Sequence, residues 1–211
     1  MTENANHIAK KLLAAGLTPA GAAGLLGNFQ AESALDPQNL QNTCERRLGM
    51  SDAAYTAAVD AGKYADFAND AAGYGLAQWT YSKRKAALLS YAKSQGKSIG
   101  DLGMQVDFAL TELRDSYPAV WNVLTTTTSV QEASDAVLTQ FERPADMSAA
   151  VRKLRGEYAF RFYAQLQANV DTAPEEAESL PNPPMPEQGE RVEVRVTVDG
   201  KVFEGVIGER E

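Results

Sequence analysis

The sequence predicts a mainly α-helical domain followed by a small β-hairpin, and three observations lead to this fold class. Through residues 1–170, apolar side chains recur every three or four positions, the spacing of one face of an α-helix. Residues 171–190 lose that spacing and contain five prolines. From residue 191 onward valines alternate with polar residues, as in a strand with one buried face. The predicted parts are therefore 1–170, 171–190 and 191–211.

The helical part opens with two helices. Ile8 and Leu12 lie four positions apart and share one face of the first. Thr18 and Pro19 begin the second, because threonine is a preferred N-cap and proline suits the first helical position. The apolar spacing of this second helix continues to about Glu32.

The later helices follow from the same spacing and from capping signals. Between them, the stretches 36–50 and 70–80 are rich in turn-forming residues and are expected to be irregular. The basic run 83–85 is expected on a solvated helix face. The predicted helices cover about 52–61, 82–95, 101–116, a short segment that opens at Pro118, 129–142 and 148–169.

The C-terminal part carries a hairpin signal. Asp199 and Gly200 form the dipeptide most typical of a two-residue hairpin turn. In that register Val196 faces Phe203, which leaves one face of the hairpin apolar. An isolated two-stranded hairpin is marginally stable in water, so we expect residues 191–207 to self-associate or to bind a partner. The preceding acidic, proline-rich segment is expected to be an extended linker.

Composition excludes several classes of function. A single cysteine, Cys44, permits neither an internal disulfide nor a multi-cysteine zinc site, and no metal or cofactor is expected. His7 is the only histidine, which weakens any histidine-assisted nucleophile. Residues 1–170 hold 16 basic and 17 acidic residues, so this part is near neutral and shows no basic patch for nucleic acid. We find neither a membrane-spanning stretch nor a signal-peptide pattern in the sequence.

Glu32 is the first candidate catalytic residue. It follows Phe29 by three positions and Leu25 by seven, so it lies on the apolar face of its helix. Burial and the nearby helix C-terminus would both raise the pKa of its carboxyl group, which suits a proton donor. A glutamate that ends a helix and bonds to a nearby turn is the competing interpretation, and the helix alone favours it.

A second segment, residues 73–80, has the composition of a sugar-binding turn. Its glycines allow a ligand to approach the backbone closely, and Tyr74 and Trp79 offer flat rings for sugar faces. Gln78 offers an amide for N-acetyl and hydroxyl groups. A buried turn with core aromatics fits the same residues equally well.

Together, residues 32–37 (ESALDP) and residues 73–79 (GYGLAQW) resemble the signature of the lysozyme-like superfamily. The pair is similar to goose-type lysozymes and soluble lytic transglycosylases, and most closely to the phage tail lysozyme family. That family also shows a segment like residues 141–144 (FERP). The resemblance covers about residues 5–165.

The resemblance implies a lysozyme-like helical fold with a small irregular or β-containing lobe. It implies cleavage of the β-1,4 bond between N-acetylmuramic acid and N-acetylglucosamine in bacterial peptidoglycan. It places the catalytic acid at Glu32 and substrate contacts at Tyr74, Gln78 and Trp79. It also implies a phage-encoded protein, released at lysis or carried on the virion, whose hairpin would bind a tail or wall partner.

One position departs from hen-type lysozymes, where an aspartate precedes the Tyr-Gly pair. Here that position is Gly73, so Glu32 is expected to lack a close carboxylate partner. Asp70 or Asp66 could activate a water on the far face of the sugar, unless they are exposed loop acids. Alternatively, the acetamido group of the substrate assists, with the 1,6-anhydro product of a lytic transglycosylase. Glu142 and Arg143 are expected to form a structural ion pair. A non-catalytic wall-binding or tail module is the remaining alternative.

Overall fold

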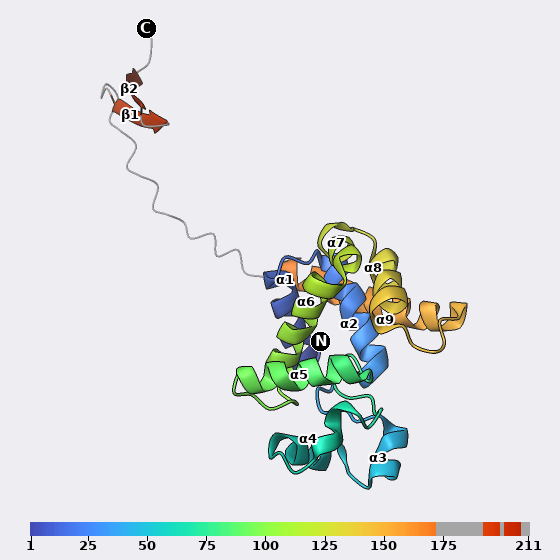
Figure 1. Cartoon of the computed structure of the whole chain (residues 1–211). Coiled ribbons are helices and arrows are strands. Elements are labelled where there is room, and N and C mark those ends of the chain that lie inside the picture. The colour runs from blue at the N-terminus through green and yellow to red at the C-terminus, as the bar shows by residue number, and fades with distance from the viewer. Residues whose placement is uncertain (172–191, 199–200, 208–211) are drawn as a thin grey trace. The chain divides into compact units, whose positions relative to one another are not determined.

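The computed structural model describes residues 1–171, 192–198 and 201–207, and the chain divides into two units, Met1–Thr172 and Ala173–Glu211 (Figure 1). The described part of the first unit is mainly helical, which confirms the predicted α-helical character of residues 1–170. None of the described helices is long and apolar enough to cross a membrane. The helices are α1 (Glu3–Ala14), α2 (Pro19–Ser33), α3 (Asn42–Leu48), α4 (Asp52–Asp60), η1 (Ala65–Ala68), α5 (Ser82–Ser94), α6 (Leu102–Ser116), α7 (Pro118–Thr126), α8 (Val130–Ala136), η2 (Val137–Glu142) and α9 (Ala149–Asp171).

Helix α2 forms the centre of this unit. It begins at the predicted threonine–proline pair, and Thr18 accepts a hydrogen bond from the backbone N–H of Gly21 at 2.9 Å. Residues 20–29 are all buried, and α2 packs against α1, α7, α8 and α9 (Figure 1). At Gly27 a Cβ atom would lie 2.6 Å from the backbone nitrogen of Ala159, so only glycine allows α9 to approach this closely. Helix α2, which carries Glu32 near its C-terminal end, is therefore fixed in position by its contacts with these neighbouring helices.

A smaller lobe lies beyond α5 and contains α3 and α4 (Figure 1). Its β structure consists of two isolated antiparallel bridges, Leu40 to Tyr74 and Tyr74 to Trp79, which is the small irregular lobe expected from the resemblance. Gln105, buried on α6, holds this lobe in place. It accepts a hydrogen bond from the backbone N–H of Leu76 at 2.9 Å and donates one to the carbonyl of Pro37 at 2.6 Å.

Two segments differ from the prediction. Residues 36–50 were expected to be irregular, yet they contain the short helix α3, which ends at Gly49 in the left-handed conformation (φ 67°) and buries Cys44. The predicted helix over 129–142 is α-helical only to Ala136, and η2 continues it as a π-helix. Over only six residues, apolar side chains recur at nearly the same spacing in a π-helix as in an α-helix. The sequence pattern therefore does not distinguish the two kinds of helix.

The second unit contains the strands β1 (Val192–Val198) and β2 (Lys201–Ile207), which pair antiparallel. Their register pairs Val192 with Ile207 and Val196 with Phe203. The predicted turn at 199–200 lies outside the described residues. So does the predicted linker, apart from Asp171, which belongs to α9. The role expected for the hairpin stays a prediction.

Candidate active site

A cleft of about 690 Å³ opens where α2, α5, η2 and the turn at 73–80 meet. Glu32 contributes its carboxyl group from the end of α2, and Gln78 contributes its side chain from the turn. Arg84 and Glu142 line it from α5 and η2. Of the residues predicted for the site, the structure thus brings Glu32 and Gln78 together in one cleft.

Glu32 lies as predicted, one residue before the end of α2, and its side chain is 17 % exposed. It forms an ion pair that the sequence did not indicate, with Arg155 of α9. The guanidinium of Arg155 also donates to the side-chain oxygen of Asn28 at 3.0 Å, and Asn28 donates to the carbonyl of Ser134 at 3.1 Å. The catalytic candidate is therefore held by a chain of contacts through α9, α2 and α8.

Ser33 joins the two sequence motifs. Its hydroxyl oxygen is buried and lies 3.1 Å from the carbonyl oxygen of Leu76, in the turn, and 3.1 Å from that of Phe29, in α2. Directly after it, Ala34 and Leu35 both take left-handed backbone conformations, with φ values of 54° and 64°. This sharp turn ends α2 and carries the chain toward the small lobe.

The side chain of Gln78 is fixed at the cleft by its own amide group. Its Nε2 atom donates to both the carbonyl and the side-chain oxygen of Asn39, at 3.0 and 2.9 Å. The Oε1 atom of Gln78 lies 2.7 Å from the point where a Cβ atom of residue 73 would be. A side chain at residue 73 would therefore collide with the amide of Gln78 as it is held here.

We expect Gly73→Asp to destabilise the helical unit by about 1–3 kcal/mol, the usual cost of overpacking a filled site. The new side chain would push Gln78 out of its hydrogen bonds with Asn39 rather than add a usable second carboxylate. Thermal unfolding followed by circular dichroism measures this loss. Gly103→Ala is the matched control, since no atom lies closer than 3.4 Å to its added Cβ. Equal melting temperatures for the two variants would contradict the explanation.

Tyr74 and Trp79 do not reach the cleft, contrary to the prediction. Both side chains are fully buried. The hydroxyl groups of Tyr74 and Thr56 lie 2.6 Å apart, and the indole N–H of Trp79 donates to Glu112 at 2.8 Å. The competing interpretation, a turn with core aromatics, describes them correctly. We therefore do not propose them as side-chain contacts with the substrate.

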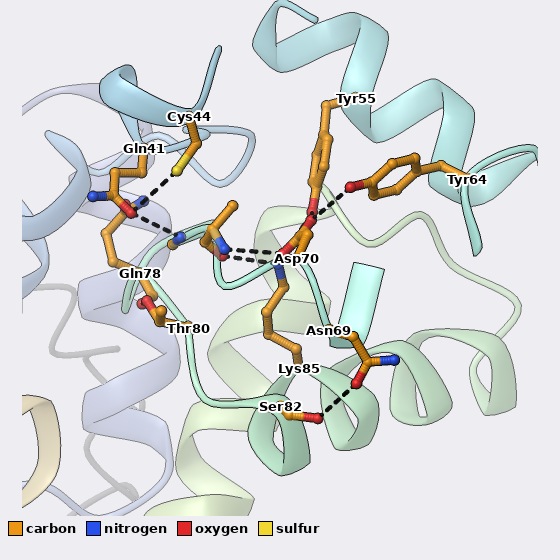
Figure 2. A network of polar contacts seen from close by, with 12 residues as sticks. Gln41, Cys44, Tyr55, Tyr64, Asn69, Asp70, Gln78, Thr80, Ser82 and Lys85 are labelled. Carbon is orange, nitrogen blue, oxygen red and sulfur yellow. Dashed lines mark hydrogen bonds and ion pairs between the residues drawn. The ribbon is translucent and has the colours of Figure 1, made fainter. Parts of the chain in front are cut away.

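Asp70 lies in a buried network of polar contacts (Figure 2). Its side chain is only 3 % exposed, and its oxygens lie 2.5 Å from both the Lys85 ammonium and the Tyr55 hydroxyl. The backbone N–H of Ala72 and the hydroxyl of Tyr64 donate to the same carboxylate. Asp70 is thus neither an exposed loop acid nor free to activate a water, and we do not propose it as a catalytic group. Asp66 is exposed on η1.

Of the basic run 83–85, Lys83 is exposed as predicted, whereas Arg84 and Lys85 are not. Lys85 is fully buried against Asp70, and burial lowers the pKa of its ammonium group although Asp70 opposes that shift. Arg84 binds both oxygens of Glu112, at 2.7 and 2.9 Å, and lies over the Phe141 ring at 4.7 Å from its centre. These residues are structural, and their acidic partners are too distant in the sequence for a local charge pattern to reveal them.

Glu142 lines the cleft, whereas the sequence predicted a structural ion pair between Glu142 and Arg143. The ion pairs of the described residues do not include the predicted contact with Arg143, whose backbone is left-handed (φ 49°). The Oε1 atom of Glu142 is buried and has no hydrogen-bond partner. Burial raises the pKa of this carboxyl well above its usual value, and the neighbouring charge of Glu32 raises it further. Its position in the segment 141–144 was the only signal in the sequence.

No cluster of three or more histidine, cysteine, aspartate or glutamate side chains suited to a metal occurs in the described part of the chain.

Comparison with known proteins agrees with this architecture. Residues 3–166 match the family model described as phage tail lysozyme. The chain is also similar to Morphogenesis protein 1 of Bacillus phage B103, with 27 % identity over 168 residues. That match covers 76 % of this chain and 39 % of the phage protein, so the chain spans well under half of that relative. The family match extends over most of the sequence and includes both motifs of the cleft, and the chain belongs to the phage tail lysozyme family.

Proposed function

We propose that the cleft cleaves the β-1,4 bond between N-acetylmuramic acid and N-acetylglucosamine in peptidoglycan, with Glu32 as the general acid. The observation that carries this proposal is the placement of Glu32 near the end of a buried helix, in a cleft that Gln78 also lines. Membership of the phage tail lysozyme family supports a role in cell-wall lysis.

Arg155 fits the chemistry of proton donation. When Glu32 gives a proton to the glycosidic oxygen, the C1–O bond breaks and its electron pair leaves on that oxygen, while Glu32 becomes negative. The guanidinium of Arg155 already contacts the carboxyl group and is held by Asn28, so it needs no reorganisation to stabilise the new charge. Glu32 then takes a proton from the group that attacks C1.

That attacking group decides between two outcomes. A water gives hydrolysis and a reducing muramic acid end. The C6 hydroxyl of the substrate gives a 1,6-anhydromuramic end, as in a lytic transglycosylase. Since Asp70 is buried away from the cleft, neither route can use it, and the products must distinguish them.

Digestion of purified peptidoglycan, followed by mass analysis of the released muropeptides, tests the proposal. We expect glycan fragments that end in muramic acid, and anhydro ends differ from reducing ends by the mass of one water. If the protein sediments with the wall but releases no fragments, the proposal is wrong and a wall-binding or tail module is favoured. The phage relative is named a morphogenesis protein, which is consistent with that second outcome.

Tyr81 is a substrate contact that the sequence did not single out. It lines the cleft and is 63 % exposed, unlike the buried aromatics of the turn. An exposed ring at the rim can stack on a sugar face, a contact of about 0.5–1.5 kcal/mol. We expect Tyr81→Ala to raise KM roughly 3- to 10-fold with little change in kcat, and Tyr81→Phe to behave like the parent. Initial rates on soluble glycan oligomers measure both values, and an unchanged KM in Tyr81→Ala would exclude stacking.

For the second unit, we propose that residues 191–207 attach the protein to a tail component, to the wall or to a second copy of itself. The alternation of valines with polar residues in β1 supports this role, because such a strand has one apolar face to cover. We propose that a phage-encoded protein of this kind acts on the wall at lysis or from the virion.

A further inference from the structure

Arg143 brings a positive charge to the cleft that contains Glu32, immediately after the end of η2. The residue is exposed and lines the same cavity of about 690 Å³. Its guanidinium group makes no ion pair with any other residue that the structure describes. Nor does it make a hydrogen bond or a ring contact within that part of the chain. The group is therefore available to a ligand that enters the cleft.

The other charged residues that line the cleft differ from Arg143 in this respect. Glu32 is balanced by Arg155, and Arg84 binds both oxygens of a glutamate on α6. The remaining acid, Glu142, forms no ion pair among the described residues, and burial raises the pKa of its carboxyl, which favours the neutral form. The cleft therefore presents one lining cation whose charge is left for a ligand to balance.

The backbone at Arg143 does not explain why an arginine stands there. Its φ and ψ angles are 49° and 52°, in the left-handed region that glycine adopts most easily. Pro144 follows it, and a residue before proline prefers an extended backbone. The N–H of Arg143 donates to the carbonyl of Leu138 at 2.9 Å, a contact that any residue except proline can make. Backbone strain of this kind is concentrated at functional sites, so we looked for a function in the side chain.

The proposed substrate carries its negative charge on one of its two sugars. N-acetylglucosamine is uncharged, whereas muramic acid bears a lactyl group. This lactyl group is a carboxylate when free, and otherwise it carries a peptide stem with carboxylates of its own. A guanidinium group binds a carboxylate through two parallel hydrogen bonds, a geometry that an ammonium group cannot reproduce.

We propose that Arg143 is a specificity-determining residue that binds a carboxylate carried by muramic acid, either on the lactyl group or on the peptide stem. This inference rests on the proposed function. The two sugars have similar rings and the same acetamido group, so contacts with rings and amides alone distinguish them poorly. A cation at one place in the cleft distinguishes them by charge, and it thereby fixes which sugar lies beside Glu32.

Binding of small ligands to the full chain tests this inference. One probe is the disaccharide GlcNAc–MurNAc with a free lactyl carboxylate, and a second is the same disaccharide with an L-alanyl-D-glutamate stem. The third, diacetylchitobiose, has no carboxylate. None of them contains the MurNAc–GlcNAc bond that the cleft is proposed to cleave, so the parent protein can be titrated directly. NMR titration of the ¹⁵N-labelled chain measures each dissociation constant.

Arg143→Gln should weaken the binding of at least one carboxylate probe by about 3- to 10-fold, as expected for an exposed but bidentate ion pair. Diacetylchitobiose should bind the parent and the variant equally. A loss confined to the stem-bearing probe identifies a stem carboxylate, and a loss with the bare disaccharide identifies the lactyl group. Arg143→Lys keeps the charge without the two parallel bonds, so its affinity should lie between those of the parent and Arg143→Gln.

Two further variants serve as controls. Lys153→Gln removes a positive charge that is 78 % exposed on α9, outside the cleft, and should bind every probe like the parent. Arg143→Gly suits the left-handed backbone, so it should melt no lower than the parent and still lose the same affinity for the carboxylate probe. This variant keeps the test valid if Arg143→Gln is unstable.

Equal affinities of the parent and the Arg143 variants for every probe would overturn the proposal. So would an equal loss with diacetylchitobiose, because the arginine would then shape the cleft without recognising charge. If the carboxylate selectivity is present but peptidoglycan is not cleaved, the proposed function fails and the carboxylate site stands. If peptidoglycan is cleaved and the selectivity is absent, the inference about Arg143 fails alone.

Discussion

Glu32→Gln is expected to lower the rate of glycan cleavage by about 10²- to 10⁴-fold, the range that a positioned general acid contributes. Glutamine has nearly the shape of glutamate and retains an oxygen that can accept from Arg155, but it has no acidic proton to give. The rate of muropeptide release from purified peptidoglycan measures the effect. A variant that cleaves as fast as the parent would remove Glu32 from the mechanism.

This result needs a control for stability, because Arg155 loses the negative charge of its partner and is itself only 7 % exposed. Circular dichroism should therefore show that Glu32→Gln is folded at the assay temperature. Glu157→Gln, which also removes one negative charge but lies exposed on α9, should keep both its rate and its melting temperature. A matched loss of activity in both variants would point to net charge instead of catalysis.

Asp70→Ala is expected to have the largest effect on stability, a loss of about 3–5 kcal/mol in the free energy of unfolding. The substitution leaves the Lys85 ammonium buried without a counterion, and it removes the acceptor of the Tyr55 hydroxyl (Figure 2). Urea unfolding of the parent and the variant measures the difference. A loss below about 1 kcal/mol would mean that water or another group compensates Lys85.

The double variant Asp70→Ala with Lys85→Met separates the ion pair from the packing around it. Removing both charges leaves no unpaired buried ion, so the double variant should recover part of the stability lost in Asp70→Ala. If it is less stable than Asp70→Ala, the aliphatic part of Lys85 and its contact with the Phe67 ring, 4.5 Å from the ammonium, account for more than the charge.

The sequence predicts most of the helices and the position of Glu32 because both follow from local spacing. Helix α2 begins at its capping threonine and ends one residue after Glu32, close to the predicted limit. The resemblance pairs the two motifs, and the structure shows the contact between them, through the hydroxyl of Ser33. The resemblance therefore predicts that the two motifs lie close together at a cleft. It does not predict which charged residues surround Glu32.

What the sequence does not reveal depends on contacts between distant segments. Arg155 lies 123 positions after Glu32, and no local pattern links them. Tyr74 and Trp79 have the composition of a sugar platform, but exposure is set by how the turn packs, and both are buried. Glu142 follows an apolar spacing that predicts an α-helix, whereas the backbone forms a π-helix and directs the carboxyl into the cleft.

The buried ion pairs also constrain how the family can vary in sequence. Glu32–Arg155, Asp70–Lys85 and Glu112–Arg84 each join different segments of the helical unit. Losing one member of such a pair costs several kcal/mol, while replacing both by apolar residues can cost little. Natural relatives that change residue 70 should therefore change residue 85 as well, and the same holds for 84 with 112. Residue 155 should change together with residue 32, whereas residue 142, which forms no ion pair among the described residues, can change alone.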